Sequence, residues 1–135
     1  MKRPIFILLC LTLFAVQSAV ASEEAGALTI KESKTCINTR LVRGFDALSD
    51  KHLYVEERSN KYFLLTLRSR CFNLESAHAI AFTDPMNFVC SKGFGEVSYR
   101  DHLSGRFETC HIDTIEAVES KAHAEAIIEA KAGDG

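Results

Sequence analysis

The stretch YFLLTL, residues 62–67, is apolar on both of the faces that a β-strand would present. A strand with one face in water alternates apolar and polar residues, so this run predicts a central strand that is covered on both faces. Residues 52–57 alternate instead, with Leu53 and Val55 expected inward and Tyr54 outward. Asn60 tolerates the left-handed backbone of tight turns, so the two stretches are expected to form a hairpin.

Short alternating segments continue on both sides of this hairpin. Residues 37–45 alternate in the manner of a half-buried strand, and residues 46–51 carry turn-forming side chains. Residues 79–82 predict a further short strand. Residues 96–100 and 106–112 predict a second hairpin, because a Gly-containing polar stretch separates them.

Helical patterns are confined to two places. Residues 73–78 predict one helical turn with Asn73 as its cap. Residues 116–132 are rich in Ala, Glu and Lys and predict a C-terminal helix with a weak apolar stripe. The fold class expected from all these segments is mainly β, a small antiparallel barrel or sandwich of about six strands with a C-terminal helix.

The N-terminus has the layout of a secretory signal peptide over residues 1–21. Lys2 and Arg3 precede an apolar run at residues 5–16, and small residues then lead to a cleavage site between Ala21 and Ser22. The apolar run is too short to span a bilayer, which requires roughly 20 residues. We therefore expect export to the periplasm or beyond, with no membrane span after the signal is removed.

The remaining chain divides into three predicted parts. Residues 22–34 are polar and predict a flexible leader, residues 35–115 a β-rich disulfide domain, and residues 116–132 the helix. The whole chain has 16 basic and 18 acidic residues, a formal charge of −2. A mildly acidic domain lacks the basic surface that nucleic-acid binding requires, so no nucleic-acid partner is expected.

Four cysteines follow the signal segment, and an even number in an exported chain predicts disulfides. They are Cys36, Cys71, Cys90 and Cys110. Four cysteines allow three pairings, and the sequence does not choose among them. The pairing of Cys36 with Cys71 and of Cys90 with Cys110 is favoured slightly, since each would join neighbouring elements.

No catalytic, cofactor-binding or metal-binding residue is predicted. Structural zinc sites show close Cys pairs, and no such pair is present. Cys71 follows Arg68 and Arg70, which could lower the pKa of a thiol, but a structural disulfide is the simpler interpretation. The common hydrolase motifs are missing as well.

Two further groups of side chains are candidate binding sites. Four arginines could converge on an anion, although solvated positions are the simpler interpretation: Arg40, Arg43, Arg68 and Arg70. Four aromatic residues could line the mouth of a barrel that holds a small ligand: Phe63, Phe82, Phe94 and Tyr99.

The cysteine frame resembles that of an uncharacterised bacterial family, one of the domains of unknown function. The resemblance rests on Cys36-Ile37-Asn38, on residues 67–74 (LRSRCFNL), on Val89-Cys90 and on residues 110–115 (CHIDTI). It implies a small exported or lipid-anchored β-rich protein, although this sequence lacks the lipid-attachment motif. It implies no activity.

The function predicted from the sequence is an exported non-catalytic domain with a binding or structural role in the cell envelope. Its partner would be an envelope protein or a small ligand. Two alternatives stay open at this point. One is a small exported thiol-redox or hydrolytic enzyme, and the other is a small-ligand binder that uses a barrel mouth.

Overall fold

The computed structural model describes residues 34–134, and the predicted signal peptide, the Ala21–Ser22 cleavage site and residues 22–33 of the leader lie outside this range. The elements in chain order are β1 (Cys36–Asn38), η2 (Thr39–Leu41), β2 (Val42–Ser49), β3 (His52–Glu57), β4 (Lys61–Leu67), η3 (Leu74–Ser76), β5 (Ile80–Thr83), β6 (Phe88–Cys90), β7 (Glu96–Arg100), β8 (Phe107–Val118) and α1 (Lys121–Gly133).

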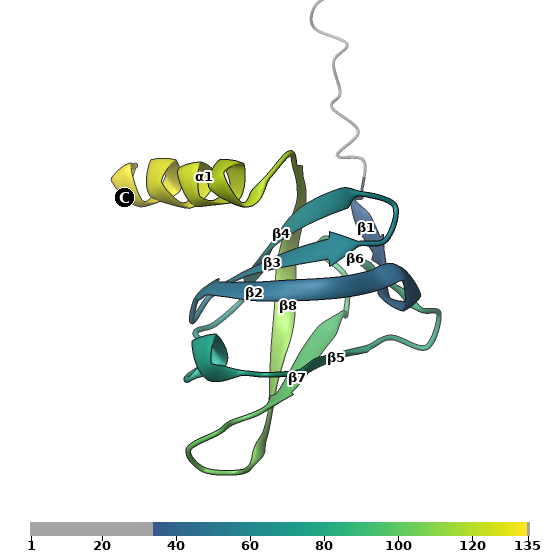
Figure 1. Cartoon of the computed structure of the whole chain (residues 1–135), viewed down its shortest axis with the longest axis vertical. Helices are drawn as coiled ribbons and strands as arrows, with labels where there is room; N and C mark the ends of the chain where they lie inside the picture. The colour runs from purple at the N-terminus through teal and green to yellow at the C-terminus, as the bar shows by residue number, and fades with distance from the viewer. Residues whose placement is uncertain (1–33, 135) are drawn as a thin grey trace, which may run out of the picture. The chain divides into compact units, whose positions relative to one another are not determined.

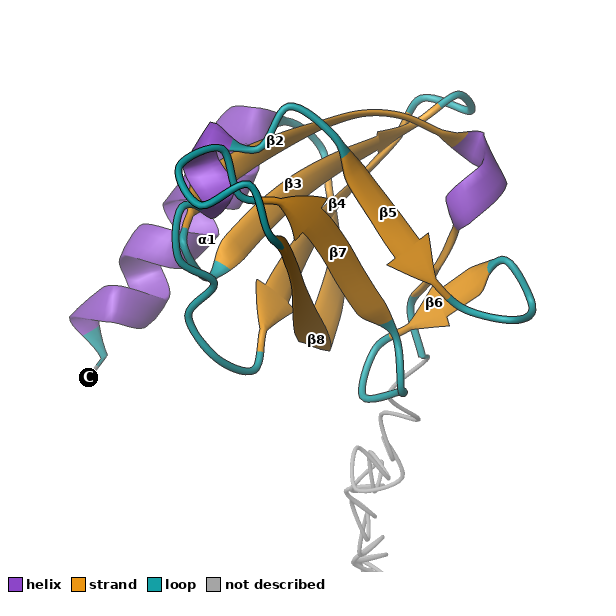
Figure 2. Ribbon diagram, turned by 90° about the horizontal axis from the view of Figure 1, so that it is seen from below, coloured by secondary structure: helices purple, strands orange, loops and turns teal. Residues whose placement is uncertain are grey.

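The described residues form a curled antiparallel sheet of six strands in the order β2-β3-β4-β8-β7-β5 (Figure 1). A separate two-stranded sheet pairs β1 with β6. The fold class is confirmed as mainly β with a C-terminal helix, and the sheet is a half-barrel. Figure 2 shows how far it curls: β2, β3 and β4 make one wall and β7 and β5 the other. Its two edges, β2 and β5, are not paired with each other.

β4 is the central strand that the YFLLTL run predicts, because β3 and β8 pair with it on its two sides. Phe63, Leu65 and Leu67 point into the main core of the half-barrel. Leu64 points the other way, into a second cluster that α1 covers. Both faces are therefore buried, as two-sided apolar strands require.

The covering helix accounts for an error in the predicted orientation of β3. Tyr54 was expected to face outward into solvent, but it is 5% exposed in the second cluster. Its ring stacks on Tyr62 with the centroids 5.9 Å apart. The outer face of β3 and β4 is thus a helix-packing surface.

The C-terminal helix begins at Lys121, so the predicted start at residue 116 was wrong. Residues Glu116 to Val118 continue β8, because they pair with Leu64, Phe63 and Tyr62 of the central strand. Ser120 then caps the helix, since its hydroxyl oxygen accepts a hydrogen bond from the His123 amide at 3.1 Å.

The predicted strand over residues 37–45 was also wrong, because η2 divides it into β1 and β2. The side-chain oxygen of Asn38 accepts the Arg40 amide at 3.1 Å and starts the helical turn. Strand β2 then runs to Ser49, so the expected turn over residues 46–51 shrinks to Asp50 and Lys51.

The cysteines pair as Cys36–Cys90 and Cys71–Cys110 within the described chain, so the favoured pairing of sequence neighbours was wrong. Cys36 and Cys90 face each other directly in the β1–β6 ladder. Cys71 lies beyond β4, and Cys110 lies on β8, which pairs with β4. The chain segments closed by the two disulfides, 36–90 and 71–110, therefore overlap. Each bridge joins elements that are distant in sequence but adjacent in the fold.

Candidate functional site

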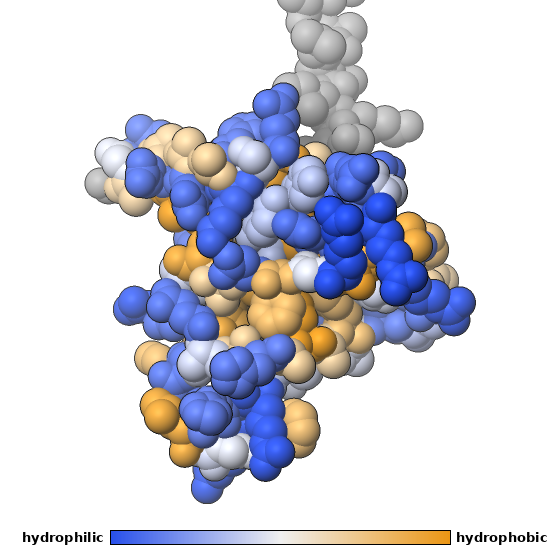
Figure 3. Space-filling model, viewed as in Figure 1, coloured by the Kyte–Doolittle hydropathy of each residue, from blue (hydrophilic) through white to orange (hydrophobic). Residues whose placement is uncertain are grey.

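One hollow of the described chain lies between the two sheet edges. A hollow of about 440 Å³ separates β2 from β5, and we call it the open side. It is lined by Thr39, Val42, Arg43, Gly44, Phe45, His78, Ala79, Ile80, Ala81 and Phe82. Figure 3 shows hydrophobic side chains gathered in this part of the face, beside strongly hydrophilic ones.

The floor of the open side is apolar because these side chains belong to the core face of their strands. Ile80 lies opposite Tyr99, and Phe82 lies opposite Val97, both buried core residues of β7. Phe45 lies opposite the buried Val55 in the same way. Since no strand closes the barrel here, the three floor residues stay only partly buried against the core.

The strand edges that flank the hollow have unpaired backbone groups. Within residues 34–134, no backbone hydrogen bond joins β2 to β5. In an antiparallel ladder every second residue of an edge strand directs its N–H and C=O away from the sheet. The open side therefore offers main-chain donors and acceptors as well as an apolar floor.

Short helical turns bound the open side. At one end, η3 packs against β2. Near the other end, η2 is fastened to the 84–87 turn, because the Thr39 amide donates to the Asn87 carbonyl at 2.9 Å. The hollow is thus a slot of limited length along β5.

A second hollow of about 390 Å³ adjoins the first, because both are lined by His78 and Ala79. Its other lining residues are Arg100, Asp101, His102 and Gly105, and we call it the histidine pocket. The rings of His78 and His102 meet edge to face with their centroids 5.5 Å apart. The Arg100 Nε donates to the Gly105 carbonyl at 3.1 Å, which orients the guanidinium on the β7–β8 turn.

Asp101 is the one carboxylate among the residues that line this described pocket, and its oxygens are already engaged. They accept the amides of Leu103 and Ser104 at 3.0 and 3.2 Å. The side-chain amide of Asn73 adds a third bond at 3.3 Å. Hydrogen bonding from the Ser104 hydroxyl first, and then from the Leu103 amide, lowers the pKa of Asp101, so this carboxylate stays ionised.

Asn73 therefore has a different role from the predicted one. It precedes η3 in a left-handed conformation with φ of 60°, and its side chain makes no cap hydrogen bond to the helix. The side chain instead joins the segment after the second disulfide to the β7–β8 turn.

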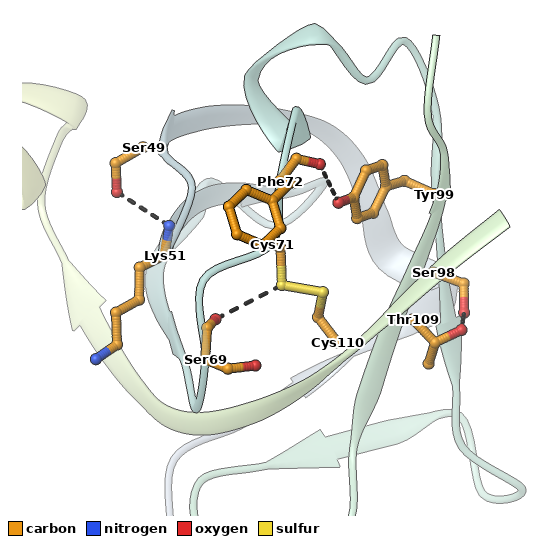
Figure 4. The surroundings of a disulfide bond; sticks show 9 residues. All are labelled: Ser49, Lys51, Ser69, Cys71, Phe72, Ser98, Tyr99, Thr109 and Cys110. Atoms are coloured by element: carbon orange, nitrogen blue, oxygen red, sulfur yellow. Dashed lines mark hydrogen bonds between the residues drawn. A yellow bond between two sulfur atoms is a disulfide. The ribbon is translucent and has the colours of Figure 1, made fainter. Parts of the chain in front are cut away.

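The Cys71–Cys110 disulfide joins the segment that precedes Asn73 to β8 (Figure 4). The Tyr99 hydroxyl donates to the Phe72 carbonyl at 2.6 Å, and burial raises the pKa of Tyr99, so the phenol keeps its proton. The disulfide and this hydrogen bond together fix the backbone from which Asn73 reaches Asp101. Cys71 is 2% exposed.

The predicted binding groups do not come together. Arg43 forms an ion pair with Glu56 at 3.4 Å, and Arg68 donates to the Gly93 carbonyl at 3.2 Å. Among the four aromatic residues, Phe63 and Tyr99 belong to the core, and Phe94 is 97% exposed in a loop. Phe82 is the member of the four that lines the open side.

Sequence reasoning missed most of the open side and the whole histidine pocket. The alternation of Ile80 and Phe82 was visible, but nothing in it marks β5 as an edge strand. His78 and His102 are 24 positions apart in the sequence, and only the β5–β7 pairing brings them together.

Two negative findings concern residues 34–134. There, no three His, Cys, Asp or Glu side chains are grouped as a metal ion would require. The helices within residues 34–134 are also too short or too polar to cross a membrane.

Comparison with known proteins gives one match. No curated protein and no solved structure matches the chain significantly. A family of unknown function, DUF6491, matches residues 1–134, which is the whole chain except for its last residue. The chain therefore belongs to the DUF6491 family.

Proposed function

We propose that this protein is an exported, non-catalytic binding domain of the cell envelope, and that its open side receives an extended segment of a partner protein. The basic, apolar and small-residue order of residues 1–21 supports export. Two disulfides in the described domain fit an oxidising compartment.

The observation that carries this proposal is the pair of unpaired strand edges on either side of a hollow that has Phe45, Ile80 and Phe82 at its floor. Strand addition is a common mode of peptide recognition, in which main-chain hydrogen bonds supply affinity and side-chain contacts supply specificity. Here β5 would supply the main-chain groups, and Phe45, Ile80 and Phe82 would contact alternate side chains of the partner.

The arrangement of polar groups favours binding over catalysis. In a hydrolytic triad, a carboxylate orients the imidazole that acts as the base. Asp101 instead accepts hydrogen bonds from two backbone amides and from Asn73. Cys71, the best candidate for thiol chemistry, is bonded to Cys110.

A small apolar ligand is the second candidate. The open side has a volume of about 440 Å³, which lies within the range of roughly 300–1,000 Å³ that is typical of ligand pockets. A ligand of this kind would contact the same floor but would make no ladder with β5. Hydrogen exchange therefore distinguishes the two, because a bound peptide would protect backbone amides of β5 from exchange and a small ligand would not.

The test measures binding of fluorescently labelled peptides, with valine or isoleucine at alternate positions, by fluorescence anisotropy. Phe82→Ala removes a ring that lines the open side, whereas Phe94→Ala makes the same change at a side chain that is 97% exposed elsewhere. We expect the first variant to weaken binding about tenfold and the second to leave it unchanged. Equal affinities in the two variants, or no binding to the unmodified protein, would contradict the proposal.

A further inference from the structure

The two edges of the open side are not equivalent as templates for a new strand. The β2–β3 register shifts twice, between Val42 and Gly44 and between Ala47 and Ser49. Such bulges leave residues unpaired and twist an edge away from a partner. The four pairs of β5 with β7 follow one another without a shift. An incoming strand therefore finds the regular edge at β5.

The direction of that strand follows from the better geometry of antiparallel pairing. A strand that runs antiparallel to β5 ends beside the start of β5, at Ile80. His78 and Ala79 immediately precede this residue and line both hollows. The C-terminal end of the partner segment would thus arrive at the histidine pocket.

The chemistry of the pocket suits a carboxylate. Arg100, His78 and His102 line the pocket, and the guanidinium is a fixed cation that can bind a carboxylate through paired N–H groups. The Arg100 Nε donates to the Gly105 carbonyl, so the terminal Nη groups are not used by that hydrogen bond. Asp101 already accepts hydrogen bonds from its own turn and from Asn73, and it forms no ion pair with Arg100 within residues 34–134.

The charge of this region contrasts with that of the whole protein. The chain carries a formal charge of −2 with its histidines counted as neutral, whereas the side chains lining the two hollows include two arginines, Arg43 and Arg100, against one carboxylate, Asp101. Arg43 is already paired with Glu56, whereas Arg100 forms no ion pair within residues 34–134, so Arg100 is the cation of this lining that is left to bind an anion.

We infer that the open side recognises the free C-terminal end of a partner protein, with the terminal carboxylate bound in the histidine pocket by Arg100, His78 and His102. This inference rests on the proposed function, because it specifies which end of an extended segment is bound. It also predicts apolar side chains at alternate positions before the terminus, where they would meet the floor of the open side.

The experiment uses one set of randomised strand peptides with alternating apolar positions, synthesised on arrays in two orientations. In one array the peptides are anchored by their N-termini and expose a free carboxylate, and in the other they are anchored by their C-termini. The full exported protein is applied to both. We expect binding to the array with free carboxylates only, and the best peptide should bind at least about tenfold more weakly as its C-terminal amide.

Two variants assign the selectivity to the pocket. Arg100→Gln removes the fixed cation that lines the pocket, and Arg106→Gln makes the same charge change on the same hairpin without being a lining residue. The first variant should lose the preference for the acid over the amide, while the second should keep it. Circular dichroism verifies that both variants keep the fold.

The outcomes separate this inference from the proposal on which it rests. Equal binding in both orientations would overturn C-terminal recognition and leave strand binding intact. Binding in neither orientation would overturn both. Self-association that increases with concentration and is lost on Ala81→Pro, a substitution within β5, would assign the edge to a second copy of the chain and would also overturn the inference.

Discussion

The closed wall of the half-barrel, β3-β4-β8, and its open side differ in what covers the strands. In the closed wall each strand is paired on both sides, and α1 covers the outer face. At the open side, β2 and β5 are each paired on one side, and their inward side chains stay half-buried. The contrast teaches that stability resides in the closed wall, while the open side keeps main-chain and apolar groups available for a partner.

The largest expected effect concerns the disulfide that ties the segment after β4 to β8 of the closed wall. Replacing both Cys71 and Cys110 with alanine removes a bridge that closes a loop of sequence separation 39, which should lower the free energy of unfolding by about 4 kcal/mol. Urea denaturation measures the loss. A decrease below about 1 kcal/mol would show that the bridge does not constrain the unfolded chain as the loop-entropy model requires.

Core truncation compares the two regions directly. Leu64→Ala empties a fully buried site beneath α1 and should cost about 3 kcal/mol, as buried leucines generally do. Ile80→Ala at the half-buried floor of the open side should cost only about 1–2 kcal/mol, because less surface is lost from the core. Denaturant unfolding of both variants measures the two losses of unfolding free energy. Equal losses would contradict the distinction between the two regions.

Glycine substitutions compare the edge strand β2 with the tightly packed contact between the start of β7 and β6. A methyl group at Gly95 would overlap the Val89 side chain, so Gly95→Ala should destabilise the fold by about 1–3 kcal/mol through overpacking. At Gly44, on the edge strand β2, the nearest atom to such a methyl group is Glu56 Oε2 at 3.7 Å. Gly44→Ala should therefore stay within about 0.5 kcal/mol of the unmodified protein in a thermal melt.

The smallest expected effect is the change of the free energy of unfolding with pH. Burial, and then the charge of Lys51, lowers the pKa of His52 in the closed wall. As the pH falls, His52 therefore takes up a proton in the unfolded chain before it does so in the folded chain. The free energy of unfolding should consequently begin to decrease below about pH 6.5. His52→Gln, which cannot titrate, should remove this first loss.

The lowered pKa of Asp101 acts at a lower pH. Its hydrogen bonds favour the ionised form in the folded chain, so its contribution persists until the pH falls to about 3.9 and below. Chemical denaturation from about pH 8 to about pH 3 would resolve both phases. A first loss that His52→Gln leaves unchanged would contradict the assignment.

Sequence patterns predicted the closed wall better than the open side. The two-sided apolar run at residues 62–67 identified β4, since only a strand covered on both faces tolerates it. Local turn chemistry also located the hairpin at Asn60, which has φ of 57°.

Features that depend on contacts distant in the sequence were not predictable. The Glu116–Val118 stretch has helical composition, but pairing with β4 overrides that propensity. The crossed disulfides and the His78–His102 contact arise only when β1 meets β6 and β5 meets β7. The candidate site is assembled entirely from such contacts, so it became visible only in the fold.

The most direct test is amide hydrogen exchange of the protein with and without the best free-carboxylate peptide from the arrays. We expect new protection at alternate amides of β5, because a ladder forms with the added strand, and no change at the already paired amides of β4. Protection that appears outside β5, or binding without any new protection along β5, would contradict strand addition at the open side.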